Sequence, residues 1–370
     1  MEYNSTIRGL GETEGGIVRD AHPGNPSVIA SIRGIVLAGG PSYGDCELEQ
    51  IMPRPMLPVA TRPLICHILS WFGHDGVGRA TVCANGNTAL FSQHLRNGEG
   101  LKVAIDYTED LMPRGPAGCA HDAARDGGEE LFVVVEGGVV PQVELSVLLE
   151  HHRSTQAAMT MVVHGGAASC NRRLEDEEPL GIYVFSRKSL SYVSKTGFCD
   201  IKEGLISDLY KRGEKVSVLR VPTDVAPRIT CRSSYLTVNG WAVEKLARTK
   251  HEFEGHVKRG DAWIHQSAVV DDSAKLVGPI WIGPGAKIGA NAMIVGPVSI
   301  GAGCEIGANA VVTRSAIWDR GLVGDSAIVD ECVVASGAQV PDQEVQRKSV
   351  CKPASKNRGG ILGWFGGNRR

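Results

Sequence analysis

The sequence predicts an α/β protein in which a domain with a mostly parallel sheet is followed by a hexapeptide-repeat β-helix. In the N-terminal two thirds, short apolar runs alternate with amphipathic segments, as in βαβ units whose helices cover both faces of a parallel sheet. Nearer the C-terminus, aliphatic residues recur every six positions, a spacing typical of stacked β-helix coils rather than of helices or flat strands. The chain has 370 residues, more than one core usually holds, so two domains are expected.

Composition excludes several classes of protein. With 42% apolar and 22% charged residues, the chain has an ordinary globular composition. Its formal net charge of -2 gives no overall attraction to nucleic acid. The ten cysteines form neither CxxC pairs nor Cys/His spacings typical of zinc sites. Because no apolar run approaches the ~20 residues of a membrane span and no signal peptide is evident, we predict a cytoplasmic protein with a flexible N-terminal arm over residues 1–30.

The first predicted strand is Ile35–Ala38, four apolar residues that are too few for a helix and are followed by glycine. The glycine pair after it either leaves backbone N–H groups open to a phosphate or forms an ordinary βα turn. A helix is predicted after Leu64. The remaining predicted strands are 80–84, 101–107, 131–135, 158–163 and 215–221, and the remaining predicted helices are 89–96, 144–154 and 236–249.

The helix predicted at 144–154 contains the adjacent residues His151 and His152. Neighbouring residues do not share a helix face, so a joint metal site is not expected. Both side chains are predicted to face solvent.

The segment 37–59 resembles the N-terminal motif of the sugar-1-phosphate nucleotidyltransferases, also called nucleotide-sugar pyrophosphorylases. The matching runs are Leu37-Ala38-Gly39-Gly40 and Pro53-Arg54-Pro55-Met56-Leu57-Pro58-Val59. The resemblance implies a Rossmann-like nucleotidyltransferase domain over residues 31–250. It also implies that Leu37, Ala38, Gly39 and Gly40 bind the nucleotide, and that Arg54 replaces the family's phosphate-binding lysine and is catalytic if the protein is active.

Two further stretches differ from the family's pattern. The loop 41–48 lacks the family's arginine that contacts the triphosphate. In the loop 110–118, which in the family wraps the base and sugar, Gly115, Ala117 and Gly118 are retained as expected nucleotide-binding residues, whereas Pro116 replaces a threonine. An ordinary βα loop is the alternative interpretation of the second stretch.

Both magnesium-binding aspartates of the resembled family are missing at their expected positions. The first position, after the strand 131–135, is Gly138, with Glu136 as an alternative carboxylate two residues earlier. The second falls at or beside Arg228, with Asp224 as a more distant candidate. No metal ligand is therefore predicted, and magnesium is expected only if the protein is active.

The region before Gly181-Ile182-Tyr183-Val184-Phe185 is shorter than in the family and holds Pro179 in place of an asparagine. Much of the family's sugar-binding edge is therefore expected to be absent.

The six-residue spacing predicts about four coils over residues 263–340, and it resembles the left-handed β-helix attached to many of these transferases. The spacing slips by one residue after Val312. Its members are Ile264, Val270, Leu276, Ile282, Ile288, Ile294, Ile300, Ile306 and Val312, and then Ile317, Val323 and Val329.

The rest of the chain, residues 341–370, is interpreted as a basic and aromatic tail. From Arg347 onward it carries basic residues but no acidic ones, together with Trp364 and Phe365. The tail is either solvated or docks on an acidic partner or an anionic membrane surface.

Three functions are compatible with this sequence. The favoured one is a degenerate regulatory protein that binds a nucleotide, a nucleotide sugar or a catalytic paralogue, and homo-oligomers formed through the β-helix are expected. The second is an active transferase that makes an NDP-sugar. The third is a β-helix acyltransferase, although His265 is the β-helix's single histidine.

Overall fold

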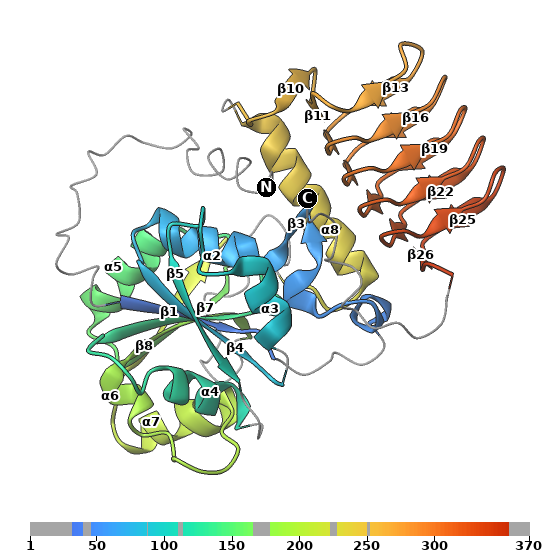
Figure 1. Cartoon of the computed structure of the whole chain (residues 1–370). Coiled ribbons are helices and arrows are strands. Elements are labelled where there is room, and N and C mark those ends of the chain that lie inside the picture. Colours follow the sequence, from blue (N-terminus) through green and yellow to red (C-terminus); the bar gives the residue numbers. More distant parts are fainter. Residues whose placement is uncertain are drawn as a thin grey trace. The chain divides into compact units, whose positions relative to one another are not determined.

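The computed structural model describes residues 32–39, 46–86, 88–109, 114–165, 178–222, 228–249 and 252–354. The chain divides into two compact units between Val257 and Lys258 (Figure 1). Among the described residues, no helix combines the length and apolar character needed to cross a bilayer. The predictions for the arm 1–30 and for Trp364 and Phe365 of the tail concern residues outside these ranges.

The first unit is organised around a seven-stranded sheet of order β5-β4-β1-β6-β8-β7-β9. Among the described strands of this sheet, β8 alone runs antiparallel to its neighbours, and the other pairings are parallel. The predicted mostly parallel sheet is therefore confirmed. The strands are β1 Ile32–Leu37, β4 Arg79–Ala84, β5 Ala104–Glu109, β6 Leu131–Glu136, β7 Met159–His164, β8 Pro179–Ser186 and β9 Val216–Val221.

Helices cover both faces of this sheet (Figure 1). Helices α2 Leu64–His74, α3 Thr88–Leu95 and α5 Leu145–Thr155 bury their apolar side chains against one face. The opposite face is covered by α4 Gly115–Ala123, α6 Arg187–Leu190, the π-helical turn η5 Ile201–Ile206 and α7 Ser207–Lys211. The remaining elements are η2 Glu47–Gln50, η3 Arg54–Met56, the hairpin strands β2 Pro58–Val59 and β3 Arg62–Pro63, and α8 Arg232–Arg248.

The predicted helix with two adjacent histidines is α5, but the prediction that both face solvent is wrong for His152. Its side chain is buried, with 3% of the residue exposed, and its Nδ1 lies 2.8 Å from Thr160 Oγ1 of β7. The hydroxyl gives the buried imidazole a polar partner, which a buried ring nitrogen requires.

Helix α2 approaches the loop before β5 so closely that Gly73 is required. A Cβ at Gly73 would overlap the carbonyl oxygen of Leu101. We expect Gly73→Ala to lower the free energy of unfolding by about 2 kcal/mol, because backbone has to shift to make room. Urea denaturation measures the change. The matched control is Gly78→Ala, where a Cβ meets no atom within 4 Å; equal stabilities of the two variants would contradict the prediction.

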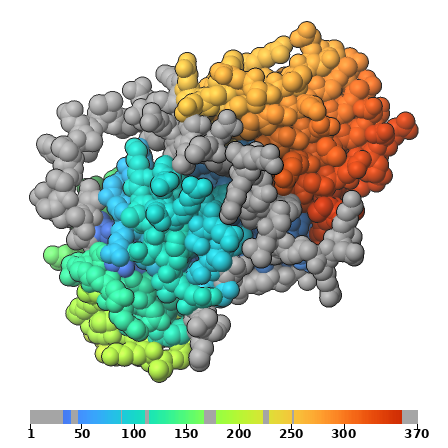
Figure 2. All heavy atoms as spheres, in the orientation of Figure 1, coloured from blue at the N-terminus to red at the C-terminus, as the bar shows by residue number. Residues whose placement is uncertain are grey.

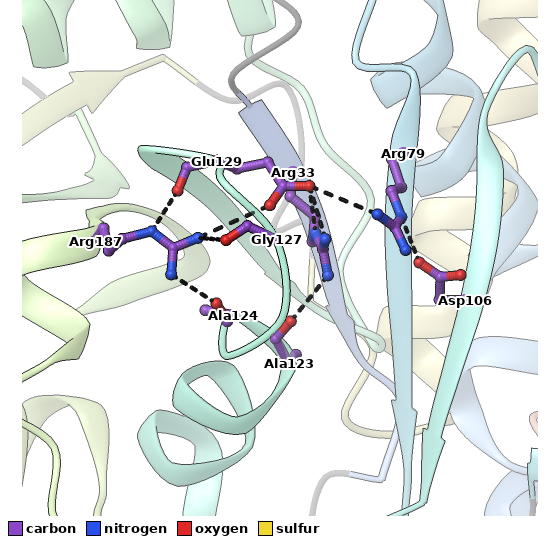
Figure 3. Close-up of polar contacts among 8 residues, drawn as sticks. All are labelled: Arg33, Arg79, Asp106, Ala123, Ala124, Gly127, Glu129 and Arg187. Atoms are coloured by element: carbon purple, nitrogen blue, oxygen red, sulfur yellow. Dashed lines mark hydrogen bonds and ion pairs between the residues drawn. The ribbon is translucent and has the colours of Figure 1, made fainter.

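A cluster of charged residues ties together the strands at the amino-terminal edge of the sheet (Figure 3). Arg33 of β1 is buried and donates from Nε and Nη2 to Glu129 Oε1, at 3.0 and 2.7 Å. Arg187, after β8, donates from Nε to the Glu129 carbonyl at 2.7 Å. Arg79 of β4 lies 4.0 Å from the same carboxylate and pairs with Asp106 of β5 at 2.6 Å. Burial alone would raise the pKa of Glu129, but the hydrogen bonds to its carboxylate and the charges of Arg33 and Arg79 together outweigh burial and lower that pKa.

From Ala262 onward, the second unit is a β-helix of three sheets whose strands pair in parallel, which confirms the architecture predicted from the six-residue spacing. Figure 2 shows the surface of these coils in orange to red. The first sheet contains β10 His256–Arg259, β11 Ala262–His265, β14 Ile280–Ile282, β17 Val298–Ile300, β20 Ala316–Ile317, β23 Val333–Val334 and β26 Val350–Cys351. The second contains β12 Val269–Val270, β15 Lys287–Ile288, β18 Glu305–Ile306, β21 Leu322–Val323 and β24 Gln339–Val340. The third contains β13 Lys275–Val277, β16 Met293–Val295, β19 Val311–Thr313, β22 Ile328–Asp330 and β25 Val345–Arg347.

The predicted one-residue slip after Val312 is confirmed by the strand pairing. Ile282 pairs with Ile300, 18 residues on, whereas Ile300 pairs with Ile317, 17 residues on. The lost residue lies at one corner, because Val295 pairs with Thr313 but Ser299 pairs with Ala316.

In the earlier coils of 18 residues, the Gly-Pro pairs 278–279 and 296–297 form this corner. In the later coils of 17 residues, a single residue with positive φ takes the place of each pair. These are Arg314, Glu331 and Lys348, at 45°, 51° and 48°. Arg314 Nη2 lies 3.2 Å from Glu331 Oε1 and Lys348 Nζ lies 3.8 Å from Glu331 Oε2, so the three form a column of ion pairs.

The stack extends past the predicted end at residue 340, because β25 and β26 add further strands. In the next coil Gln346 pairs with Val329, so a polar residue replaces the aliphatic residue that marks the earlier coils.

Candidate functional site

The predicted nucleotide-binding residues after β1 lie at the carboxyl end of the parallel strands. Ala38 N donates to Cys83 O of β4 at 2.7 Å. Gly39 is in tight contact with Asn85, whose side-chain amide donates to the Gly39 carbonyl and would overlap a Cβ at Gly39. Gly40 lies outside the described residues. The loop therefore begins where ligands bind in sheets of this type.

Arg54 lies over the end of β6. The backbone there is held to β1, because Gly137 N donates to Leu37 O at 2.9 Å. Arg54 Cδ and Nη1 are each 3.4 Å from the point where a Cβ on Gly138 would stand. The Arg54 guanidinium also forms an ion pair with Glu49, and the two side chains are only 10% and 13% exposed. Arg54 thus lies against the position of the first missing aspartate.

Arg228 lies beside the same stretch of backbone. Its backbone forms an isolated antiparallel bridge with Val139, the neighbour of Gly138. Arg228 Nη1 lies 2.8 Å from Glu136 Oε2, and Tyr183 OH donates to Glu136 Oε1 at 3.1 Å. The two positions predicted for the missing aspartates are therefore adjacent, and the carboxylate between them is paired with an arginine.

Gly181 of β8 makes room for this ion pair. It has a φ of +85°, and a Cβ there would stand 3.0 Å from Glu136 Cδ and 3.1 Å from Arg228 Nη2. Burial and the nearby Glu136 carboxylate raise the pKa of Tyr183 well above its ordinary value. The tyrosine hydroxyl therefore stays protonated and donates its hydrogen bond to Glu136 at neutral pH.

The second predicted loop leads into α4. Gly115 has a φ of +78° and comes so close to Cys199 that a Cβ would stand 2.5 Å from the Cys199 oxygen. Ala117 N donates to the same oxygen at 3.2 Å, and Gly118 lies against the side chain of Arg114. The backbone donor of Ala117 is thus used within the protein. Residues 110–113 lie outside the described ranges.

A pocket of about 200 Å³ lies at this end of the sheet. Among the described residues, Pro116 of the second loop lines it, whereas Arg54 and the predicted residues of the first loop do not. Three carboxylates, two cations, a tyrosine and two prolines line it, so the pocket is polar and its charged side chains sum to -1. Phe198, which is 71% exposed, precedes the lining residues of η5. The lining consists of Pro116, Glu136, Glu178, Pro179, Tyr183, Asp200, Ile201, Lys202 and Arg228.

Several of these residues were not predicted to belong to a functional site. Tyr183 and Asp200 stand within runs that match the family, Gly181–Phe185 and Phe198–Ile201, and this match is the signal that could have identified them. Glu49 lies beside the stretch that departs from the family, so no motif marks it.

The residues at this point do not fit magnesium. Magnesium requires oxygen ligands, whereas Gly138 has no side chain and lies against Arg54, and its neighbour Val139 forms a backbone bridge with Arg228. Two unit charges of like sign 4 Å apart repel by about 4 kcal/mol at an effective dielectric of 20. Across the part of the chain that the structure describes, no group of three or more His, Cys, Asp or Glu side chains is placed to hold a metal.

Comparisons with known proteins match both units. Residues 33–172 match the nucleotidyl transferase family, and residues 276–352 match the GMPPB C-terminal domain. A mannose-1-phosphate guanylyltransferase of Mycobacterium tuberculosis is 26% identical over 266 residues, 66% of this chain and 73% of that protein. A mannose-1-phosphate guanylyltransferase regulatory subunit alpha of Xenopus tropicalis is 24% identical over 296 residues, 64% of this chain and 70% of that protein.

The match is shorter for other relatives and for a solved structure. With mannose-1-phosphate guanylyltransferase 1 of Arabidopsis thaliana the identity is 25% over 163 residues, and the chain spans 43% of that protein. A putative glucose-1-phosphate thymidylyltransferase of Bacillus anthracis, solved with sucrose, has a TM-score of 0.48 and 19% identity, covering 57% of this chain and 95% of that one.

Proposed function

We propose that this chain, in which residues 33–172 match the nucleotidyl transferase family and residues 276–352 match the GMPPB C-terminal domain, binds a nucleotide or nucleotide sugar with little or no catalysis. Its role is then regulatory. The relatives are named for guanylyl transfer to mannose 1-phosphate, so GDP-mannose is the first ligand to test. The name of one relative, a regulatory subunit, supports pairing with a catalytic paralogue.

The observation that carries this proposal is the pair of arginines around Gly138. Nucleotidyl transfer gathers negative charge on a triphosphate and an incoming phosphate, which a metal clamp ordinarily stabilises. Here Arg54 lies against Gly138, and Arg228 holds Glu136, a nearby carboxylate. Guanidinium groups can bind phosphates, but they do not supply the coordination sites of a metal. The site therefore favours binding over turnover.

A thermal-shift experiment tests the binding. A ligand at 100 times its dissociation constant stabilises a protein by about 2.7 kcal/mol, which raises the melting temperature of a domain of this size by roughly 5 to 10 °C. We expect such a shift with GDP-mannose, GDP or GTP. Arg54→Gln should reduce it, whereas Arg79→Gln, a half-exposed arginine in the cluster at the opposite edge of the sheet, should not. The proposal fails if none of the three ligands shifts the wild-type protein.

A further inference from the structure

We infer that Arg54 and Arg228 take the place of a divalent cation in this site, and that Glu49 and Glu136 are built-in counter-ions that a ligand's phosphates displace. The inference rests on the proposed function and states how the same site holds the anionic part of its ligand. It predicts a binding site for phosphates that works without metal.

The first guanidinium is fixed by its surroundings. Arg54 begins η3 and lies against the backbone at Gly138, with Cδ and Nη1 each 3.4 Å from a Cβ position there. Any larger residue at 138 would compete for this space. Its ion-pair partner Glu49 sits on the neighbouring η2, and both side chains are nearly buried. Arg54 and Glu49 therefore form an ion pair at the end of β6 before any ligand binds.

The second guanidinium is held beside the same stretch of backbone. The bridge between Arg228 and Val139 fixes its main chain, and Glu136 binds its Nη1 at 2.8 Å. Tyr183 binds the other oxygen of Glu136, and Gly181 leaves room for the pair because it has no Cβ. These contacts place Arg228 in the wall of the pocket, where a ligand can reach it.

The charges of these four side chains explain how an anion would bind. Two guanidinium and two carboxylate groups sum to zero, and the other charged residues of the pocket lining, Glu178, Asp200 and Lys202, add a net charge of -1. The site therefore has no net attraction for phosphate while both ion pairs are closed. Phosphate and carboxylate oxygens compete for the same forked donors of arginine. Neutralising either glutamate should therefore strengthen phosphate binding, whereas added magnesium should not.

The test is calorimetric titration of the full chain with GDP, once in excess EDTA and once in excess magnesium. The dissociation constant of the wild type should agree within about twofold between the two conditions. Glu136→Gln and Glu49→Gln should each bind GDP about tenfold more tightly, the fold-change that follows from one charge-assisted contact. Arg228→Gln should bind about tenfold more weakly by the same estimate. Arg79→Gln is the matched control and should leave the affinity unchanged.

The outcomes separate this inference from the proposed function. GDP binding that is tenfold or more tighter in magnesium than in EDTA, on the order of one lost metal contact, would overturn the inference and leave the proposed function standing. Weaker binding by both Glu136→Gln and Glu49→Gln, with circular dichroism spectra like that of the wild type, would also overturn it. If the wild type and both glutamate variants fail to bind GDP in either condition and the thermal-shift screen is negative, the proposed function fails as well.

Discussion

With GTP, mannose 1-phosphate and magnesium, pyrophosphate release by the wild-type protein should be at least about a thousandfold slower than the ~10 per second typical of enzymes. A metal clamp contributes several kcal/mol to phosphoryl transfer, and about 4 kcal/mol corresponds to a factor of a thousand. This protein has Gly138 at one expected aspartate position and Arg228 beside it. Nothing among the described residues at this point compensates for the lost carboxylates.

Restoring one carboxylate should not recover the activity. In Gly138→Asp, the new side chain would start 3.4 Å from Arg54 Nη1, so it should form an ion pair with Arg54 rather than hold magnesium. A coupled assay that detects pyrophosphate measures both proteins, and the mannose-1-phosphate guanylyltransferase of Mycobacterium tuberculosis serves as the reference. Wild-type turnover near 1 per second, abolished by Arg54→Ala, would refute the argument from the missing carboxylates.

Lowering the pH from 7 to 5 should destabilise the first unit by about 2 kcal/mol through His152 alone. Burial, followed by the charges of Arg153 and His151, lowers the pKa of His152 from 6.5 to about 4. Between these two values the unfolded chain binds a proton that the folded chain does not. Stability therefore falls as the pH falls through this range. Burial also lowers the pKa of His67 to about 3, so His67 adds a loss in the same direction.

Urea denaturation at pH 7 and pH 5 measures this loss, and pH 5 lies above the range in which most carboxylates titrate. The variant His152→Gln can still bond Thr160 but does not titrate. Its loss of stability between the two pH values should be smaller than that of the wild type by about 2 kcal/mol. An equal loss in the two proteins would show that His152 takes up its proton in the folded state.

Most of the fold could be predicted because its elements carry local patterns. The predicted strands 80–84, 131–135, 158–163 and 215–221 lie within one residue of β4, β6, β7 and β9. Likewise, the aliphatic spacing located the slip at the β-helix corner. The antiparallel direction of β8 was not predicted, because a run such as GIYVF has the same composition in either direction. His152 was misplaced because its burial depends on Thr160 of β7, a contact that no pattern within α5 reveals.

The candidate site was predictable only where it follows a motif. Matching to the family placed Gly138 and Arg228 at the expected positions of the two magnesium-binding aspartates. In the structure these positions are adjacent, because Arg228 bridges Val139, the neighbour of Gly138. The ion pairs were not predicted, since Glu136 and Arg228 are far apart in sequence and meet only because β6 ends beside the segment before α8. Glu49 lies beside the stretch that departs from the family and no motif marks it, so its pairing with Arg54 depends on the folded chain.

The corner column of the β-helix bears on how many coils the domain can have. Arg314, Glu331 and Lys348 alternate in sign from one coil to the next. Deleting the coil that contains Glu331 would bring Arg314 next to Lys348, so two attractive contacts would be replaced by one repulsion. Exposed pairs of this kind are individually weak, but the alternation disfavours loss of that single coil. Loss of the coil at either end of the column would still leave one attractive pair, so the column disfavours loss of the middle coil in particular.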